Sequence, residues 1–134
     1  RIGAVDFLPA NQLLQYGIRS GDREEFREMR QAKRLIHGVE ALKLALSNHR
    51  HRPIYLTVDI DVFDPSLVPG TGTPEFGGIA WKEFEEILEA LRSFKIVAAD
   101  VMELAPQHDH SNCSAILASK LVRELSLVMA SSPR

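Results

Sequence analysis

An apolar segment that follows Pro53 and ends in two aspartates restricts the fold more than any other part of the sequence. Side chains on a β-strand alternate between its two faces, so Thr57, Asp59 and Asp61 share one face and the other face is wholly apolar. Residues 63–78, which follow, are rich in Pro, Gly and Thr, which excludes a helix or a central strand. The sequence therefore predicts a strand that buries one face and ends in a carboxylate-bearing loop.

Upstream of this segment we expect a short strand and one or two helices. Residues 13–18 form a short apolar stretch that we interpret as a strand. Asp22, with Glu25 three positions later, forms a capping-box pattern that predicts the start of a helix. Apolar residues then recur at helical spacing to about residue 47, with an interruption at His37-Gly38. Propensity alone leaves open whether this is one helix or two.

Downstream, the pattern predicts a helix over 81–91, a buried strand over 96–104 and a last helix that Ser111 or Asn112 caps. Alternating strands and helices are typical of a parallel sheet with helices on its faces, so we assign the chain to the α/β class. Function in such sheets collects at the carboxyl ends of the strands. The apolar stripe of the last helix includes Ile116, Leu117, Leu121, Leu125 and Val128.

Two interpretations of Asp59 and Asp61 are open at this point. Carboxylates two residues apart on a strand repel one another, and each resists ionisation unless a cation lies beside them. A hard divalent metal with oxygen ligands is such a cation. Alternatively, the two are solvated aspartates at the end of a strand, although Asp is depleted within strands. Asp64, which precedes Pro65, is better explained as a brace of the loop than as a ligand.

The bulk composition sets limits on partners and location. The chain has 134 residues, one domain or part of one, and a formal net charge of −2, which provides no long-range attraction to nucleic acid or to an anionic membrane. The single cysteine excludes an internal disulfide, and we expect a cytoplasmic protein. The first residue is Arg rather than Met, which indicates processing or a part of something longer.

Three strings together resemble the ureohydrolase family of arginases and agmatinases. The central one is Asp-Ile-Asp-Val-Phe-Asp-Pro (59–65), continued by Pro-Gly-Thr-Gly-Thr-Pro (69–74) and Gly-Gly (77–78). The second, Tyr-Gly-Ile-Arg-Ser, precedes it, and the third, Asp-Val-Met-Glu-Leu-Ala-Pro, follows it. Arginases tend to carry Ala at Gly70, so the loop is more similar to the agmatinase branch. The resemblance covers nearly all of the chain, in the right order.

The resemblance implies a three-layer αβα fold with a parallel sheet, of which residues 1–134 are the C-terminal part of one domain. It implies that Asp59 bridges two Mn²⁺ ions, that Asp61 binds one of them, and that the ions lower the pKa of a water that attacks the guanidinium carbon. Glu103 is then the residue that holds the guanidinium by charge-assisted hydrogen bonds. The implied reaction is hydrolysis of a guanidino compound to urea and an amine, agmatine to putrescine first among them. We also expect a homo-oligomer, because an exposed sheet edge favours association.

Half of the expected metal site is missing from the sequence. The family takes further metal ligands from Gly-Gly-Asp-His and Asp-Ala-His-x-Asp strings, and neither occurs here. A catalytic histidine of the same upstream region is absent too, so we predict no catalytic residue in this chain beyond the metal ligands. Two aspartates cannot close a dinuclear site, and we expect the chain alone to bind Mn²⁺ poorly. A truncated, non-catalytic fragment is therefore an alternative, as is specificity for arginine or guanidinobutyrate.

Other interpretations have less support. A haloacid-dehalogenase-type phosphatase also begins with Asp-x-Asp after a strand, but the Pro-Gly-Thr-Gly-Thr-Pro loop has no place in one. An EF-hand is excluded because Ile60, Val62 and Phe63 are apolar where that loop needs polar residues and Gly. His108 and His110 around Asp109 allow a second metal cluster, although solvated loop histidines explain them better. We expect Arg19 to be structural and Cys113 to be a small core residue.

Overall fold

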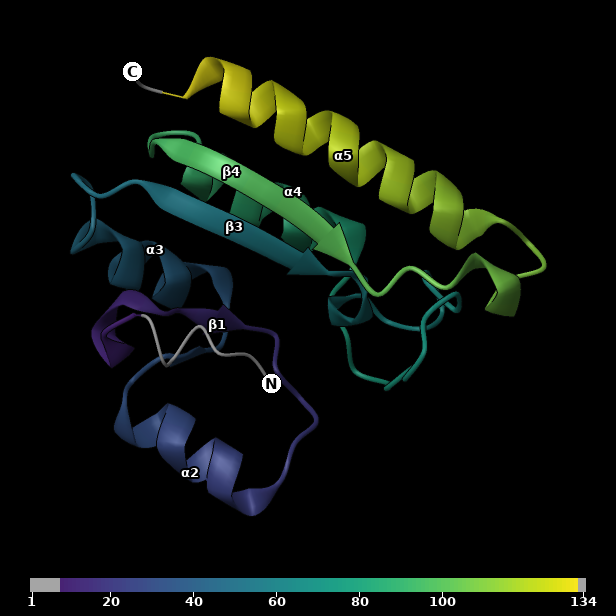
Figure 1. Ribbon diagram of the computed structural model, residues 1–134, viewed down its shortest axis with the longest axis horizontal. Helices are drawn as coiled ribbons and strands as arrows, with labels where there is room; N and C mark the ends of the chain where they lie inside the picture. Colours follow the sequence, from purple (N-terminus) through teal and green to yellow (C-terminus); the bar gives the residue numbers. More distant parts are fainter. Residues whose placement is uncertain (1–7, 133–134) are drawn as a thin grey trace.

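Two parallel strands, β3 (Ile54–Asp59) and β4 (Ile96–Met102), lie at the centre of the fold (Figure 1). The computed structural model describes residues 8–132. In the register of the pair, Asp59 lies opposite Met102, so both strands end at the same edge. The parallel pairing predicted from the alternation of elements is confirmed, and the second strand ends two residues earlier than expected.

Helices cover one face of this pair. Val58 of β3 is buried and belongs to the same core as the apolar sides of helices α3, α4 and α5, whereas Tyr55 and Thr57 on the opposite face are exposed. Helix α5 runs alongside β4 in Figure 1. The fold is thus α/β, as predicted, with helices packed against the apolar face of the strands. The three helices span Val39–Ser47 (α3), Trp81–Leu91 (α4) and Cys113–Ser131 (α5).

A second parallel pair, β1 (Gln15–Tyr16) with β2 (Leu35–Ile36), precedes the central one. Helix α2 (Arg23–Gln31) connects the two strands and begins with the predicted capping box, because Asp22 accepts a hydrogen bond from the backbone N–H of Glu25. The expectation that helical structure extends through residue 36 is wrong. The chain leaves α2 with Lys33 in a left-handed conformation (φ 53°), and Ile36 is then buried in the core as a strand residue. The predicted strand over 13–18 is shortened to two residues.

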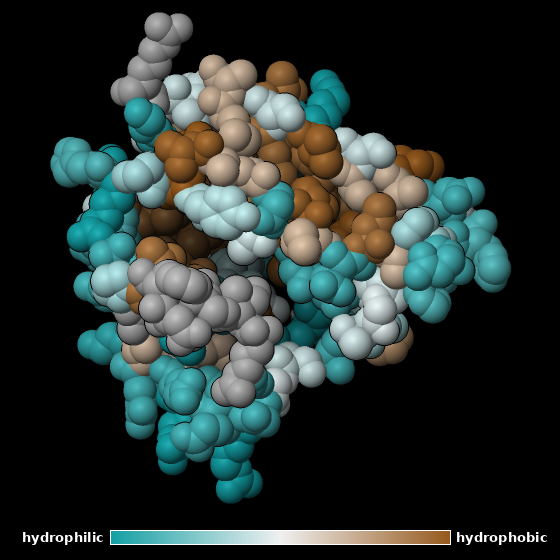
Figure 2. All heavy atoms as spheres, in the orientation of Figure 1, coloured by the Kyte–Doolittle hydropathy of each residue, from teal (hydrophilic) through white to brown (hydrophobic). Residues whose placement is uncertain are grey.

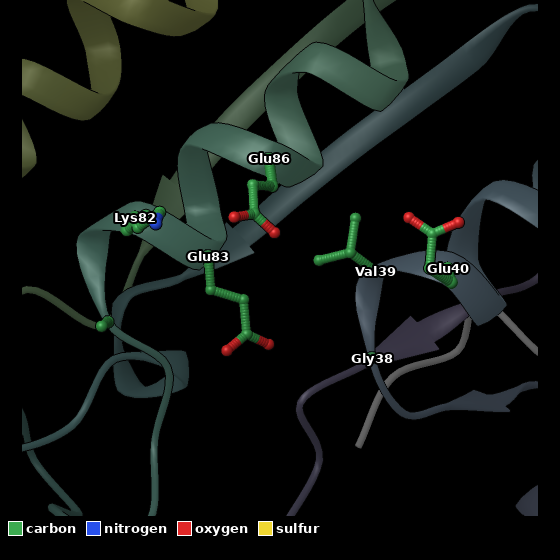
Figure 3. Close-up of a pocket in the computed structure, with 7 residues that line it drawn as sticks. Gly38, Val39, Glu40, Lys82, Glu83 and Glu86 are labelled. Carbon is green, nitrogen blue, oxygen red and sulfur yellow. The ribbon is translucent and has the colours of Figure 1, made fainter.

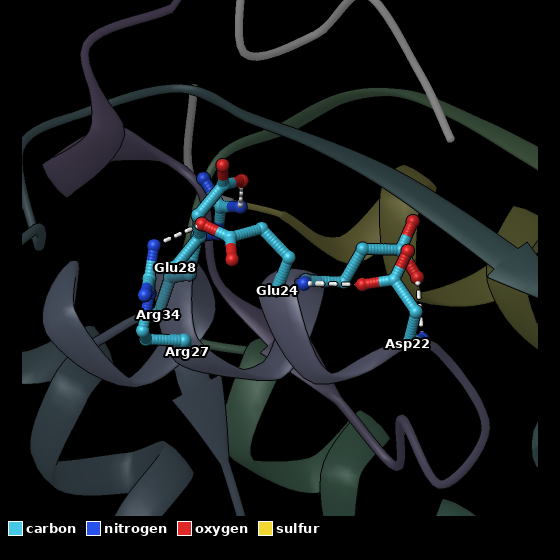
Figure 4. A network of polar contacts seen from close by, with 6 residues as sticks. Asp22, Glu24, Arg27, Glu28 and Arg34 are labelled. Carbon is cyan, nitrogen blue, oxygen red and sulfur yellow. Dashed lines mark hydrogen bonds and ion pairs between the residues drawn. The ribbon is translucent and has the colours of Figure 1, made fainter.

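The exposed surface of α2 carries ion pairs (Figure 4). Arg27 contacts Glu24 one turn earlier, and Arg34 lies 3.9 Å from a carboxylate oxygen of Glu28. The pair of Arg27 and Glu24 is exposed, and an exposed pair contributes only ~0–1 kcal/mol. The position of α2 is therefore determined mainly by its buried Met29 and by the strands on either side.

Helix α5 begins where the sequence predicted, whereas one residue of its predicted buried stripe is exposed. Asn112 is the N-cap residue, but the carboxylate of Asp109 accepts the hydrogen bond from the backbone N–H of Ser114 at 2.7 Å. The hydroxyl of Ser111 accepts one from Cys113 N at 3.2 Å, so Ser111 shares the capping as expected. Cys113 is exposed, and its assignment to the core is wrong because it precedes the first buried position of the helix.

The outer side of α5 is unusually apolar. Ile116, predicted to be buried, is 67% exposed, whereas Leu121, Leu125 and Val128 of the predicted stripe are buried, together with Ser114 and Ala118. Figure 2 shows apolar residues gathered over the strands and α5, and hydrophilic ones around α2. Within residues 8–132, no helix combines the length and the apolar character that a bilayer crossing requires.

Candidate metal and substrate site

The strand β3 ends at Asp59 because the side chain of that residue turns the chain. Asp59 Oδ1 accepts a hydrogen bond from the backbone N–H of Asp61 at 2.9 Å, a local bond that competes with the strand ladder. Residues Ile60–Val62 consequently form a short 3₁₀ helix, η2. The alternation predicted that Asp61 would continue the face of the strand, and this prediction is wrong. Asp61 lies on a turn beside Asp59.

One oxygen of Asp61 has no partner among the residues that the structure describes. Its Oδ2 accepts a hydrogen bond from the hydroxyl of Thr73 at 2.9 Å, whereas its Oδ1 is buried and unpaired within the described residues. An unsatisfied buried carboxylate oxygen is costly unless a cation binds it. The donor set, oxygen from two carboxylates, is the kind that Mn²⁺ accepts. The chemistry of these two carboxylates is therefore compatible with a divalent metal.

Several neighbours act on the charge of Asp59. Partial burial raises the pKa of its carboxyl group, and the negative charges of Asp61 and Glu103 raise it further. The Asp61 N–H and the Arg19 guanidinium act in the opposite direction and lower it. The net effect disfavours the ionised form of Asp59. The three carboxylates at the ends of β3 and β4 therefore create a region of negative electrostatic potential. A cation bound there would relieve it.

Glu103 follows the last residue of β4 in a left-handed conformation, with φ at 64°. Only a few per cent of residues other than glycine adopt a positive φ, which costs of order 1–3 kcal/mol and is found mainly at functional sites. The turn is held in place because Ala105 N donates to the carbonyl of Gly70 at 2.8 Å. The structure therefore brings Glu103 to the same edge as Asp59, as the sequence predicted.

Asp64 braces the loop that follows the two aspartates. Its carboxylate accepts hydrogen bonds from the backbone N–H groups of Ser66 and Gly77, each at 3.0 Å. Hydrogen bonds from the Ser66 hydroxyl and these N–H groups lower the pKa of Asp64. Because both oxygens are satisfied by the loop itself, the structural role predicted for Asp64 is confirmed.

The described residues hold only part of a metal site. Across residues 8–132, no three His, Cys, Asp or Glu side chains are placed so that they could hold one ion. A second metal cluster at His108 and His110 is not found there either. The Asp109 between them is buried and accepts hydrogen bonds from Ser111 and Ser114. Asp59 and Asp61 by themselves therefore do not make a complete metal site in the part of the chain that the structure describes.

A separate hollow lies between the beginnings of α3 and α4 (Figure 3). Glu83 and Glu86 extend from α4 toward Val39 and Glu40 at the start of α3. The phenol of Tyr16 donates a hydrogen bond to Glu83 at 2.5 Å. None of the three site carboxylates lines this hollow, so it is not part of the site.

The acidity of Asp109 makes the capping of α5 pH-dependent. Hydrogen bonds from Ser111 and Ser114 hold the pKa of Asp109 well below its usual range, so the folded pKa lies below the unfolded one. The stabilisation is therefore present above about pH 4, the unfolded pKa, and is lost as the pH falls toward the folded pKa. We expect Asp109→Asn to lower the free energy of unfolding at pH 7. Urea denaturation should show the gap from wild type closing below about pH 4, and a gap that is constant with pH would contradict this origin.

Sequence reasoning missed the role of Thr73, whose hydroxyl orients Asp61. A threonine within a Pro-Gly-Thr-Gly-Thr-Pro loop gives no periodic signal, and its separation of twelve positions from Asp61 hides the contact. Arg19 was expected to be structural, and its guanidinium does bind backbone carbonyls of η2 and of the loop. Arg19 and these carbonyls are more than forty residues apart in the sequence, so local sequence patterns do not predict the contacts.

The chain belongs to the arginase family, whose model matches residues 3–128. It is 40% identical to an agmatinase from Bacillus anthracis over 127 residues, which are 91% of this chain and 44% of that protein. Its fold is similar to proclavaminate amidino hydrolase from Streptomyces clavuligerus (TM-score 0.82, 33% identity, 96% of this chain and 46% of the other). It is also similar to arginase from Bacillus subtilis (TM-score 0.78, 27% identity, 87% and 45%).

Within the family, the chain is a ureohydrolase relative that is similar to agmatinases over most of its length. It aligns with the C-terminal part of these proteins and spans less than half the length of the relatives it matches. The predicted family and fold are confirmed, and the phosphatase and EF-hand alternatives are rejected.

Proposed function

We propose that the complete protein uses Mn²⁺ to hydrolyse a guanidino compound to urea and an amine, with agmatine as the first candidate substrate and putrescine as its amine product. The observation that carries the proposal is the buried, unpaired Oδ1 of Asp61 beside Asp59, at the edge where Glu103 also lies. The agmatinases that match most of the chain support the choice of substrate.

Each site residue has a role that its surroundings support. Asp59 and Asp61 would hold the metal, which when bound supplies an activated water near neutral pH. Thr73 donates a hydrogen bond to one oxygen of Asp61, so that the other oxygen would be available to hold the metal. Glu103 would accept hydrogen bonds from the guanidinium, and these bonds are stronger than neutral ones because both partners are charged. Further ligands and the group that moves protons would come from outside this chain.

Relatives with other substrate names match the same residues. A guanidinopropionase from Pseudomonas aeruginosa is 36% identical over 120 residues, 87% of this chain and 34% of that protein. Guanidino substrates differ at the end remote from the guanidinium, which none of the three site carboxylates is proposed to bind. A urea-release assay of the complete protein on agmatine, arginine, guanidinobutyrate and guanidinopropionate tests the proposal. Release from none of them, with Mn²⁺ present, would support the non-catalytic alternative.

Glu103→Gly is expected to separate stability from activity. Glycine adopts a positive φ without strain, so the variant should gain about 1 kcal/mol in free energy of unfolding, as measured by urea denaturation. It loses the carboxylate that would bind the guanidinium, and a charged hydrogen bond of ~1.5–3 kcal/mol corresponds to a loss of roughly 10–100-fold in kcat/KM.

Glu103→Gln is the matched control for this variant, because it keeps the backbone strain and removes only the charge. We expect it to lose activity without gaining stability. Unchanged kcat/KM in both variants would remove Glu103 from the substrate site.

A further inference from the structure

Arg19 joins three separate parts of the chain at the metal-binding turn. It follows β1, and its guanidinium lies against η2 and the loop after it. Nη2 donates to the carbonyls of Asp61 at 2.5 Å, Glu75 at 2.6 Å and Phe63 at 3.3 Å, and Nε donates to Glu75 at 3.0 Å. A planar group with several N–H donors in a fixed arrangement suits this multiple contact, and an ammonium group does not reproduce it.

Two of the carbonyls that Arg19 binds, those of Asp61 and Phe63, lie where a short helix leaves carbonyls unpaired. The last carbonyls of a helix have no partner within it, and the negative end of the backbone dipoles favours a cation there. Arg19 satisfies the carbonyls of Asp61 and Phe63 at the end of η2, the turn that begins with Asp59. The bonds therefore fix the backbone that carries both aspartates.

The same guanidinium also fixes the other side of Asp61. By binding the carbonyl of Glu75 it holds the end of the loop that contains Thr73, and the Thr73 hydroxyl is the partner of Asp61 Oδ2. The approach of the Arg19 segment is close, since a Cβ at Gly17 (φ 72°) would lie 2.7 Å from Val62 Cγ2. Arg19 thus determines the position of the turn and of the loop that orients its carboxylate.

We propose that Arg19 is a positioning residue for the metal site, which holds η2 and the loop around Thr73 so that Asp59 and the unpaired oxygen of Asp61 face one ion. This inference rests on the proposed function, because it assumes that the two aspartates bind Mn²⁺. It assigns Arg19 no contact with metal or substrate. Groups that support metal ligands in this way typically contribute 10–100-fold to metal affinity.

The test measures Mn²⁺ affinity of the complete protein by electron paramagnetic resonance of free Mn²⁺, together with the thermal midpoint of the metal-free form. We expect Arg19→Gln to weaken affinity by roughly 10–100-fold. Arg19→Lys keeps the charge and loses the planar fork, so its affinity should lie between those of Arg19→Gln and wild type. It also keeps the inference testable if Arg19→Gln does not fold.

Leu125→Ala is the control for general destabilisation, because Leu125 is a core residue of α5 and lies outside the site. It should lower the thermal midpoint and leave Mn²⁺ affinity unchanged. Wild-type affinity in both folded Arg19 variants, or an equal loss of affinity in Leu125→Ala, would overturn the positioning role alone. Absence of Mn²⁺ binding by the wild-type protein would overturn the proposed function and this inference with it.

Discussion

Asp59→Asn in the complete protein is expected to abolish Mn²⁺-dependent release of urea. The change removes the carboxylate charge where β3 meets η2, whereas it keeps the size of the side chain and an oxygen that can accept the Asp61 N–H. The loss should exceed the roughly 10–100-fold that supporting groups of metal sites contribute, because a ligand itself is weakened. A urea assay with and without Mn²⁺, alongside a Mn²⁺ titration, measures it.

The stability of the metal-free Asp59→Asn protein separates loss of metal from loss of fold. Burial and the nearby Asp61 and Glu103 charges raise the pKa of Asp59 in the folded state, so its ionised form is disfavoured there. The thermal midpoint of the metal-free variant at neutral pH should consequently equal or exceed that of wild type. Asp22→Asn, at an exposed helix cap, is the control and should retain activity. Full activity in Asp59→Asn, or after complete chelation, would refute the metal assignment.

Gly78→Ala is expected to have the largest effect on stability. A Cβ at this position would lie 2.3 Å from the carbonyl carbon of Phe63 and 2.4 Å from the nitrogen of Asp64, both backbone atoms of the metal-binding segment. The backbone there is fixed on both sides, since Asp64 N donates to Ile79 O at 3.1 Å and Ile79 N donates to Val62 O at 2.9 Å. Relief requires a shift of main chain, so we expect a loss of about 3 kcal/mol or more, measured by urea denaturation.

Two neighbouring glycines provide matched controls. A Cβ at Gly72 meets nothing within 4 Å and its φ is not in the left-handed region, so Gly72→Ala should be nearly neutral. Gly77 also has open space but a φ of 84°, so Gly77→Ala should cost only the backbone strain of about 1 kcal/mol. Equal stability of all three variants would show that contact with Phe63 and Asp64 is not what requires glycine at Gly78.

Local rules account well for the parts of the fold in which neighbours in sequence are neighbours in space. The capping box at Asp22, the amphipathic helix α4 and the strands β3 and β4 follow from periodicity and composition. Those rules fail at Leu35–Ile36, where helical spacing continues but the residues pair with β1. Tertiary pairing and burial of Ile36 override a local preference of a few tenths of a kcal/mol.

In the candidate site, too, some features follow from the sequence and others depend on the tertiary structure. Asp59, Asp61 and Glu103 could be selected from the sequence, because carboxylates at the ends of apolar strands are unexpected and match a long family motif. The turn at Asp61, the left-handed backbone of Glu103 and the contact of Thr73 could not. They depend on where loops meet, and loop conformation has no periodic sequence pattern.

The sequence by itself determined the family, the α/β class and the three carboxylates proposed to bind metal and substrate. Only the tertiary structure decided that Asp61 leaves the strand with one oxygen unpaired and that Arg19 binds the turn across forty-two residues. The physical reason for this difference is that residue type and spacing indicate which side chains are charged and which are expected to be buried. The pairing of buried polar groups, by contrast, is settled by contacts between segments far apart in the chain.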